Sequence, residues 1–268
     1  MKTVLTIAGF DPSSGAGVTA DLMVFAAHGL FGTSVITSLT VQSTLGVAAS
    51  HPLDAEIVGH TLRYLEQDIP AAGIKIGMLA TARTVEQVAA FVSEVRARRG
   101  ELIVVLDPVL RSSSGRELLD AAGVELLQRR LLPLVDWITP NLDELGLLTS
   151  SCVTNRYEML EAALQLQGET GAHILAKGGH LGENASPDDL LLPRTGERYW
   201  LTGERIVTRA THGTGCALSS ALLSRLVLGD SPRAAAEAAK RYLEGALRTA
   251  VPIGQGHGPM HHLWPLRP

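Results

Sequence analysis

The sequence predicts an α/β fold: a three-layer αβα sandwich in which helices cover both faces of a mostly parallel central sheet. Short β-branched runs recur along the chain and alternate with longer segments of helical spacing. These runs are apolar on both faces, as strands are when helices cover a parallel sheet from both sides. Because no linker, repeat or low-complexity segment divides the 268 residues, we expect a single domain over residues 1–268.

Strands and helices are expected to alternate along most of the chain. The β-branched and apolar runs predict strands at residues 3–8, 34–41, 74–76, 102–106, 137–139 and 173–176. Helical spacing or composition predicts helices at residues 17–30, 55–67, 84–98, 116–131, 156–170, 216–228 and 233–250. Residues 181–203 are polar and loop-like, so we expect a hairpin or a flap near a site there.

Charge and cysteine content exclude several classes of protein. The formal net charge of −4 gives no general attraction for phosphate backbones, so nucleic acid is not an expected partner and an anionic ligand needs a local site. Cys152 and Cys216 lie far apart and outside any CxxC pattern, which favours a reduced, cytoplasmic location. The first apolar run is too short for a signal peptide, and no stretch reaches the roughly 18 apolar residues of a membrane span.

The most informative segment is THGTGC at residues 211–216, directly before a helical pattern. Glycines beside a helix start let backbone N–H groups converge on an anion, and the helix dipole adds partial positive charge there. On spacing alone, a plain glycine turn that leads into a helix explains the segment equally well. Cys216 favours the anion site, because a thiol at a helix N-terminus has its pKa lowered from about 8.5 and can accept a proton. The alternative for Cys216 is a small buried core residue.

Segments along nearly the whole chain share one resemblance. THGTGC resembles the catalytic signature of the ribokinase-like vitamin kinases, in which GTGC stands where sugar kinases have GxGD with an aspartate base. The other matching segments are LTIAGFDPSSGAGVTADL, SVITSLTVQSTLGV, KIGML, LDPVL, ITPNLDE, AKGGH and GHGPMHH. Together they make the chain similar to the hydroxymethylpyrimidine/phosphomethylpyrimidine kinase family of thiamin biosynthesis.

The resemblance implies a ribokinase-like kinase that uses ATP and Mg²⁺ and forms a homodimer. Its substrate would be 4-amino-5-hydroxymethyl-2-methylpyrimidine, phosphorylated first to the monophosphate and then to the diphosphate. Pyridoxal kinase is the nearest relative and includes cysteine-type enzymes of the same branch, so it is the alternative activity. Phe10, Ser43 and RSSSG at residues 111–115 depart from the family pattern and leave the preferred substrate open.

The resemblance also assigns residues to the acceptor side of the site. The substrate-binding residues that it implies are Gly9, Asp21, Gln42 and Met78. The amide of Gln42 suits an aminopyrimidine because it offers both a donor and an acceptor. Without the resemblance, Gln42 is a polar residue at a strand end and Met78 a core residue. The implied catalytic residues are Gly213, Thr214, Gly215 and Cys216. Their backbone N–H groups would hold the phosphoryl group while Cys216 takes the proton of the acceptor hydroxyl.

On the nucleotide side the resemblance implies a set of acidic and cationic residues. The cofactor-binding residues are Asp107, Thr139, Lys177 and Thr211, and the Mg²⁺ ligands are Asp107 and Glu144. Mg²⁺ binds one or two protein carboxylates and keeps several waters, and a lysine ammonium can follow the charge of a phosphate. The alternatives are a capping turn before Pro108 for Asp107, a first-turn helix charge for Glu144 and a solvated side chain for Lys177.

Other functions have weaker support. Gly15, Gly17 and Ala20 form GxGxxA after the first strand, the fingerprint of a dinucleotide-dependent oxidoreductase, but no acidic residue follows at the required distance of about 20 positions. GxxxxGK[ST] and GxSxG are absent, which disfavours P-loop kinases and α/β-hydrolases. We expect His212 to shape its loop, and the tail histidines His257, His261 and His262 to be structural.

Overall fold

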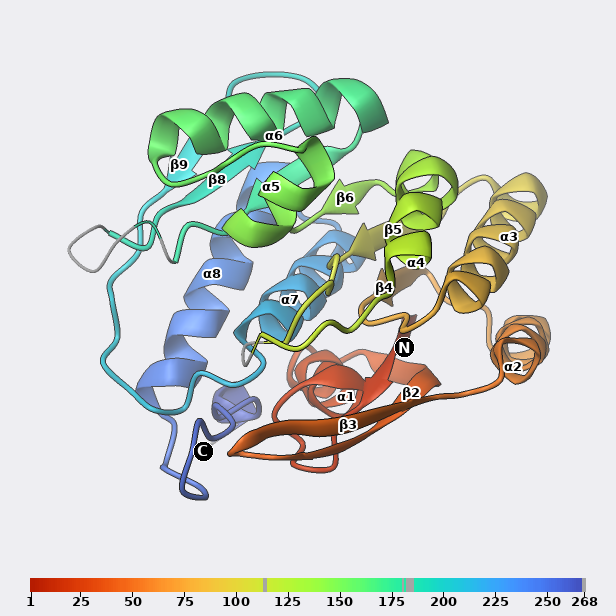
Figure 1. The fold of residues 1–268 in the computed structure, drawn as a ribbon, viewed down its shortest axis with the longest axis horizontal. Coiled ribbons are helices and arrows are strands. Elements are labelled where there is room, and N and C mark those ends of the chain that lie inside the picture. The colour runs from red at the N-terminus through yellow and green to blue at the C-terminus, as the bar shows by residue number, and fades with distance from the viewer. Residues whose placement is uncertain (113–114, 180, 182–185, 267–268) are drawn as a thin grey trace.

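The computed structural model describes residues 1–112, 115–179, 181 and 186–266. Over these residues it forms one nine-stranded sheet of order β3-β2-β1-β4-β5-β6-β7-β8-β9 (Figure 1). The strands are β1 (Thr3–Phe10), β2 (Phe31–Ser43), β3 (Gly46–Pro52), β4 (Gly73–Ile76), β5 (Ile103–Leu106), β6 (Trp137–Ile138), β7 (His173–Ala176), β8 (Asp189–Leu192) and β9 (Tyr199–Leu201).

The six central strands β2, β1, β4, β5, β6 and β7 pair in parallel, as the sequence predicts. The strand pairs at the two edges, β2–β3, β7–β8 and β8–β9, are antiparallel. β4 and β5 are buried almost throughout, which explains why they read as short apolar runs rather than as alternating patterns. The parallel arrangement brings the carboxyl ends of the central strands to one edge of the sheet.

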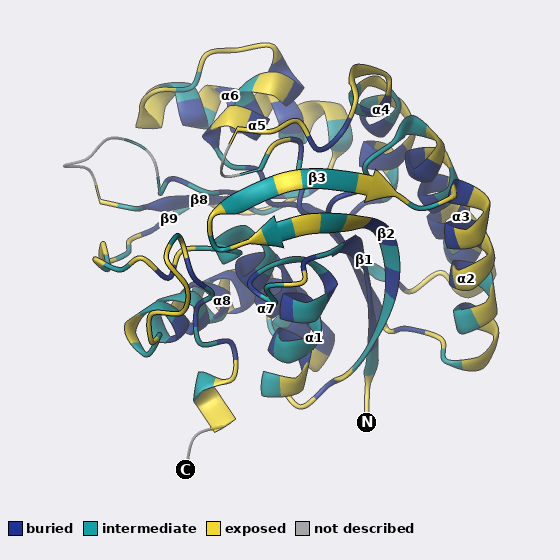
Figure 2. Cartoon of the chain, turned by 60° about the horizontal axis from the view of Figure 1, so that its bottom comes forward, coloured by how far each residue is buried: buried dark blue, intermediate teal, exposed yellow. Residues whose placement is uncertain are grey.

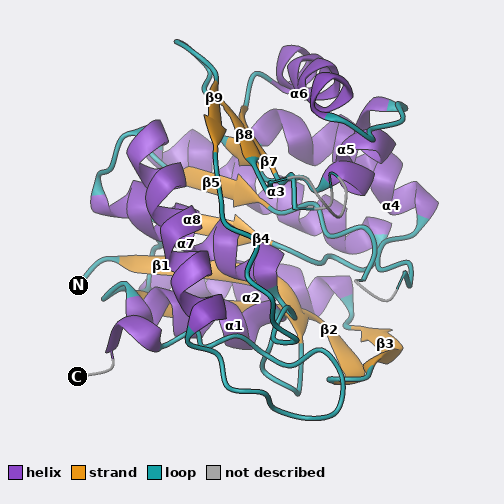
Figure 3. Cartoon of the chain, turned by 90° about the vertical axis from the view of Figure 1, so that its left-hand side faces the viewer, coloured by secondary structure: helices purple, strands orange, loops and turns teal. Residues whose placement is uncertain are grey.

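Helices cover both faces of the sheet, which confirms the predicted three-layer sandwich (Figure 3). One layer contains α1 (Gly17–Ala27), α7 (Thr214–Leu228) and α8 (Pro232–Arg248). The other contains α2 (Ala55–Asp68), α3 (Ala82–Arg99), α4 (Ala121–Leu126), α5 (Leu142–Thr149) and α6 (Arg156–Thr170). Each layer packs a separate apolar core against its own face of the sheet, and burial of this apolar surface is the main stabilising term.

Two helical predictions need correction. The helix predicted at residues 116–131 begins only at Ala121, because the extended Asp120 caps it by accepting from Gly123 N at 2.6 Å, and Glu117 and Leu119 before it form isolated β-bridges. Its last turn, Leu127–Leu131, is a π-helix. Helix α5 was not predicted, although Asn141 and Glu144 form a capping box at its start, a pattern visible in the sequence.

The polar segment at residues 181–203 contains the antiparallel pair β8–β9, so the predicted hairpin is confirmed. Residues 182–185 of this region lie outside the described residues, as do residue 180 of the AKGGH segment and residues 113–114 of the RSSSG segment. The antiparallel strand β3 at the other edge was not predicted either. Among the helices of the described residues, none is both long and apolar enough to cross a membrane.

Candidate active site

Several predicted site residues follow the carboxyl ends of neighbouring parallel strands. Met78 lies just after β4, Asp107 follows β5, Thr139 follows β6 and Lys177 follows β7. Since these strands pair in parallel, the four residues lie along one edge of the sheet. In open α/β sheets, ligands bind in the crevice outside this edge. The fold therefore places the predicted nucleotide residues where such sheets bind ligands.

Lys177 joins two carboxylates at this edge. Its Nζ lies 2.7 Å from Oδ1 of Asp107 and 3.7 Å from Oε2 of Glu144. Thr139 Oγ1 donates to the same Asp107 oxygen at 3.2 Å. Asp107, Thr139 and Glu144 are all buried. Two carboxylates around one ammonium leave an excess of negative charge, so the cluster favours a further cation when all three groups are ionised.

Burial and charge set the protonation of this cluster. Burial raises the pKa of Glu144 to about 7, and Asp107 adds to the rise while Lys177 opposes it. Burial alone would lower the pKa of Lys177, but Asp107 and Glu144 outweigh that effect and raise it. Glu144 also accepts from Asn141 N at 2.8 Å in the capping box of α5. The first turn of α5 therefore holds Glu144 in place beside a permanently charged Lys177.

The N-terminus of α7 packs directly against the cluster. Gly213 caps the helix, so Thr214, Gly215 and Cys216 form its first turn. A Cβ atom at Gly215 would lie only 3.2 Å from both Lys177 Nζ and Asp107 Oδ2. The N–H groups of a first helical turn have no partner within the helix and carry partial positive charge. A phosphoryl group at this turn would thus meet both the helix N-terminus and the Lys177 ammonium.

Gly213 requires glycine for two reasons. Its φ is +81°, which L-residues with a side chain rarely adopt, and a Cβ would lie 1.9 Å from the carbonyl oxygen of Gly15. We expect Gly213→Ala to displace the turn and to lower kcat/KM for phosphoryl transfer by about 100-fold, the usual cost of a shift of about 1 Å in a catalytic group. Steady-state kinetics measure this loss.

Gly229 at the other end of α7 supplies the matched control. It also has a positive φ, +106°, but a Cβ there would meet no atom within 4 Å. Gly229→Ala should therefore cost about 1–2 kcal/mol of folding free energy and leave kcat/KM near the wild-type value. If kcat/KM falls equally in Gly213→Ala and Gly229→Ala, the loss at Gly213 does not come from displacement of its turn.

The predicted lowering of the Cys216 pKa is wrong. Cys216 is half-buried as a residue, but its thiol is enclosed, and this burial raises its pKa to about 11. Lys75 and a hydrogen bond from the backbone N–H of Gly17 oppose the rise, while Asp21 and Asp107 reinforce it. The helix dipole does not outweigh desolvation at this position. Cys216 is therefore a neutral thiol at pH 7.

Asp21 is fully buried and forms an ion pair with Lys75, which is also fully buried. Oδ2 of Asp21 lies 2.8 Å from Lys75 Nζ, and its Oδ1 accepts from Ser220 Oγ of α7 at 2.8 Å. Its role toward a substrate stays a prediction. Lys75 was missed as a functional candidate, although a lysine between Ile74 and Ile76 in a buried strand requires a buried counter-charge.

The residues predicted to bind substrate gather beside the loop before α7. A Cβ at Gly9 would lie 3.0 Å from Met78 Sδ, and the carbonyl of Gly9 packs against Gly17. Gln42 on β2 lies 2.8 Å from Nε2 of His212, the residue before Gly213. Gly9, Met78 and Gln42 are thus connected to the α7 turn through Gly17 and His212.

Thr211 is the exception among the predicted residues. It is exposed, and its Oγ1 lies 3.0 Å from Nδ1 of the tail residue His257. No contact between Thr211 and the Lys177 cluster is present in the described part of the chain. The structure brings Asp107, Thr139, Glu144 and Lys177 together and leaves Thr211 outside their cluster.

Comparison with known proteins identifies the family. The sequence model of the phosphomethylpyrimidine kinase family matches residues 11–261. The chain belongs to this family. It is 39% identical to the hydroxymethylpyrimidine/phosphomethylpyrimidine kinase of Haemophilus influenzae over 98% of this chain and 97% of that protein. It is 40% identical, over 97% of its length, to the thiamine biosynthesis bifunctional protein ThiED of Geobacter sulfurreducens, of which it spans only 52%.

Solved structures support the same fold. A phosphomethylpyrimidine kinase from Clostridium difficile matches with a TM-score of 0.78 and 33% identity, covering 92% of this chain and 100% of that one. The ADP complex of Bacillus subtilis pyridoxal kinase matches with a TM-score of 0.87 and 28% identity, covering 98% and 97% of the two chains. The predicted α/β fold and the predicted family are thus confirmed, and the sheet edge described above is the candidate active site of a family kinase.

The donor set of the site fits Mg²⁺ bound together with a nucleotide. Asp107 and Glu144 supply hard carboxylate oxygens, and Oδ2 of Asp107 accepts no hydrogen bond from any residue that the structure describes. Groups of three or more His, Cys, Asp or Glu side chains suited to a metal are absent from the described residues. One or two carboxylates without an all-protein cage is the usual arrangement for Mg²⁺ held largely by substrate phosphates.

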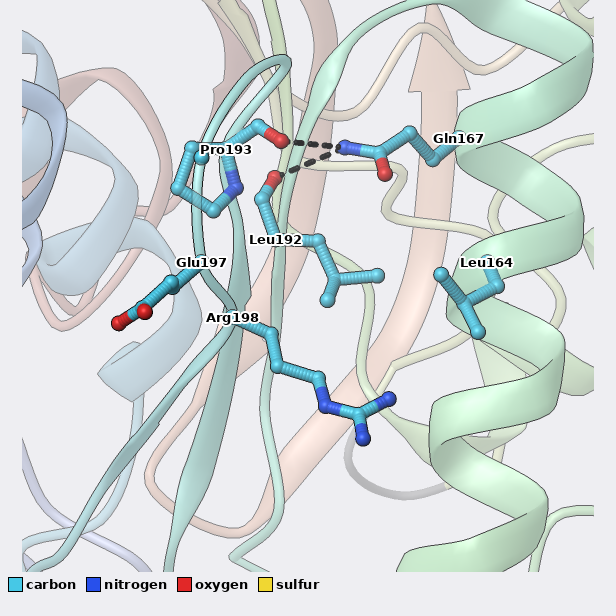
Figure 4. A pocket seen from close by; sticks show the side chains of 7 residues that line it. Leu164, Gln167, Leu192, Pro193, Glu197 and Arg198 are labelled. Carbon is cyan, nitrogen blue, oxygen red and sulfur yellow. Dashed lines mark hydrogen bonds between the residues drawn. The ribbon is translucent and has the colours of Figure 1, made fainter.

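Two surface hollows of this protein lie away from the sheet edge. One, of about 480 Å³, lies between α6 and the β8–β9 hairpin, and the other, of about 510 Å³, lies beside the start of α6. In the first, the amide nitrogen of Gln167 already donates to the carbonyls of Leu192 and Pro193 (Figure 4). Neither hollow contains a residue predicted to bind or to react, so neither competes with the sheet edge as the site of chemistry.

Proposed function

We propose that this family kinase transfers the γ-phosphoryl group of ATP to 4-amino-5-hydroxymethyl-2-methylpyrimidine, and then to the resulting monophosphate, in thiamin biosynthesis. One observation carries the proposal: the first turn of α7, which contains Cys216, packs against the Asp107–Lys177 ion pair. The relatives named as hydroxymethylpyrimidine/phosphomethylpyrimidine kinases, one of which matches over 97% of its length, support the substrate.

On the nucleotide side, Lys177 and the N–H groups of Gly213, Thr214, Gly215 and Cys216 would bind the transferring phosphoryl group. Phosphoryl transfer passes through a loose transition state, so positioning and charge stabilisation account for most of the catalysis. Asp107 and Glu144 would hold Mg²⁺, which neutralises phosphate charge when bound. Thr139 donates to Asp107 and so fixes the orientation of that carboxylate.

On the acceptor side, Cys216 would accept the proton of the 5-hydroxymethyl group as oxygen bonds to phosphorus. The buried thiol must itself be deprotonated first, since its pKa lies near 11. The monophosphate is already an anion near neutral pH and needs no such base. Gly9, Gln42 and Met78 would contact the pyrimidine ring, with Asp21 behind them as the counter-ion of Lys75.

This assignment predicts different pH profiles for the two steps. A raised thiol pKa means that the native site favours the protonated form, so the thiolate fraction grows with pH up to about 11. We expect kcat for the alcohol to rise by about tenfold per pH unit between pH 7 and 9. Transfer to the monophosphate should stay nearly constant over the same range. Parallel profiles would contradict a thiolate base at Cys216.

Pyridoxal is the second candidate acceptor, because the ADP-bound pyridoxal kinase of Bacillus subtilis matches the fold over 98% of this chain. The test is to incubate the purified protein with Mg-ATP and separately with hydroxymethylpyrimidine, its monophosphate, pyridoxal and ribose, and to resolve the products by chromatography. Phosphate on both pyrimidines supports the proposal. Turnover of pyridoxal alone would replace it with pyridoxal kinase activity.

We also propose a cytoplasmic homodimer. Leu39 and Val41 on β2 and Leu45 in the hairpin turn expose 44%, 53% and 75% of their surface. Figure 2 shows exposed segments along the β2–β3 hairpin. Exposed apolar side chains gathered on one strand face are typical of an interface between copies of a chain. Light scattering should give the dimer mass, and Val41→Lys should give the monomer mass. A monomeric wild-type protein at micromolar concentration would contradict this part of the proposal.

A further inference from the structure

Asp11, His212 and Gln42 form a continuous polar chain between the first loop and β2. Nε2 of His212 lies 2.7 Å from Oδ2 of Asp11, and the side-chain amide of Gln42 lies 2.8 Å from the same His212 nitrogen. The ring of His212 cannot move far, because Gly15 packs against it so closely that a Cβ there would lie 2.2 Å from His212 Cδ2. His212 N also donates to the carbonyl of Gly258 at 3.2 Å.

The proton on His212 Nε2 is fixed by Asp11. Burial alone would raise the pKa of Asp11, but hydrogen bonds from His212 and Ser13 outweigh it and lower the pKa to about 2. Asp11 is therefore a carboxylate, which can only accept, and the backbone N–H groups of Gly15 and Ala16 already donate to its Oδ2. His212 Nε2 consequently carries a hydrogen directed to Asp11, so it has no lone pair with which to accept a hydrogen bond from Gln42.

The proton of Thr40 is fixed in the same way on the other side of Gln42. Thr40 Oγ1 lies 2.9 Å from the carbonyl oxygen of Phe10 and 3.1 Å from the amide of Gln42. Since the carbonyl can only accept, the single hydroxyl proton of Thr40 goes to Phe10. Thr40 is then an acceptor toward Gln42.

These two neighbours leave one orientation for the Gln42 amide. If the amide nitrogen of Gln42 faced His212 Nε2, two N–H groups would face each other. Turning the Gln42 amide by half a turn about its Cγ–Cδ bond places its oxygen toward His212 and its NH₂ group toward Thr40. Resting on the proposed function, we propose that Asp11 and His212 are a positioning pair that fixes the donor–acceptor polarity of Gln42 and thereby selects 4-aminopyrimidines over their 4-oxo analogues.

The selection follows from the edges of the two rings. A 4-aminopyrimidine presents an amino donor beside a ring-nitrogen acceptor, whereas the 4-oxo tautomer presents an oxygen acceptor beside a ring N–H donor. With the 5-hydroxymethyl group held at Cys216, the ring cannot turn over to exchange these positions. A Gln42 amide of fixed polarity pairs with the first edge, and turning it to pair with the second would break its contacts to both His212 and Thr40.

The experiment compares kcat/KM for 4-amino- and 4-oxo-5-hydroxymethyl-2-methylpyrimidine in the wild type, His212→Phe and Thr40→Val. We expect the wild type to prefer the amino compound by about 10–100-fold, the range given by one two-point amide contact. His212→Phe keeps an aromatic ring against Gly15 and removes the Nε2 donor, so the preference should fall to within about threefold of unity. His60→Phe, on the exposed side of α2, is the matched control and should keep the wild-type preference.

A separate readout distinguishes positioning from general damage. In His212→Phe, the KM for ATP should stay within about twofold of the wild type, because the Lys177 cluster on the nucleotide side is untouched. If His212→Phe does not fold, as judged by circular dichroism, Thr40→Val must show the same loss of preference. An unchanged ratio in the folded variants, or a wild type without preference, overturns the inference. Absence of turnover with every pyrimidine rejects the proposed function itself.

Discussion

Cys216→Ala is expected to lower kcat for phosphorylation of the hydroxymethyl alcohol by about 10²–10⁴-fold, the usual contribution of a general base. The same change should lower kcat for the monophosphate by less than about tenfold, because that acceptor is already ionised and needs only the backbone N–H groups of the α7 turn. Alanine keeps those N–H groups and the helix start at Gly213. Separate initial rates with the two acceptors measure the difference.

The control for this variant is Cys152→Ala, since Cys152 is exposed and lies before α6, away from the Lys177 cluster. It should leave both rates unchanged. Similar losses in both steps for Cys216→Ala would contradict a proton-accepting role and would assign the residue to the shape of the turn instead.

Lys177→Met is expected to lower kcat for both acceptors by about 10²–10³-fold, as loss of a donor to the transferring group does in other enzymes. The KM for ATP should rise as well. The ammonium lies 2.7 Å from Asp107 and 3.7 Å from Glu144, so it acts on the nucleotide side, which the two steps share. Steady-state kinetics with each acceptor and varied ATP test this equality.

Stability must be measured beside activity for this variant. Removing Lys177 leaves the buried carboxylates without their cation, which costs about 3–5 kcal/mol when one partner of a buried pair is deleted. Thermal melting separates this cost from catalysis. Lys2→Met, whose lysine donates to the Val227 carbonyl, is the matched control and should keep full activity. A folded Lys177→Met enzyme with near-wild-type kcat would remove Lys177 from the mechanism.

The sequence predicts the central fold well because its signals there are local. Buried strands such as Gly73–Ile76 and Ile103–Leu106 are short apolar runs between helical patterns, and these periodicities identify the layers. The edges were less predictable, because β3 and β9 are partly exposed and depend on their partners rather than on an apolar pattern. The helix α4 begins only at Ala121 because Asp120 caps it. Helical composition alone did not reveal this cap, so the predicted helix began too early.

The site was predictable in its residues and less so in its electrostatics. Asp107, Glu144 and Lys177 are more than 30 residues apart in sequence, so only the family resemblance predicted that they share a site. The structure brings them together at the carboxyl ends of parallel strands. The pKa of Cys216 could not be predicted, because it depends on burial and on Lys75 and Asp21 rather than on the helix alone. The link from Asp11 through His212 to Gln42 spans more than 200 residues and has no local sequence signal.

The central claim is that phosphoryl transfer takes place between the first turn of α7 and the Lys177 cluster. A crystal structure with Mg²⁺, ADP, aluminium fluoride and the aminopyrimidine tests it most directly. The account predicts the fluoride group within hydrogen-bond distance of the N–H groups of residues 213–216 and of Lys177 Nζ, with the pyrimidine against Gln42 and its hydroxymethyl group near Cys216. Binding of the nucleotide at the hollow between α6 and the β8–β9 hairpin, or of the pyrimidine away from Gln42, would contradict it.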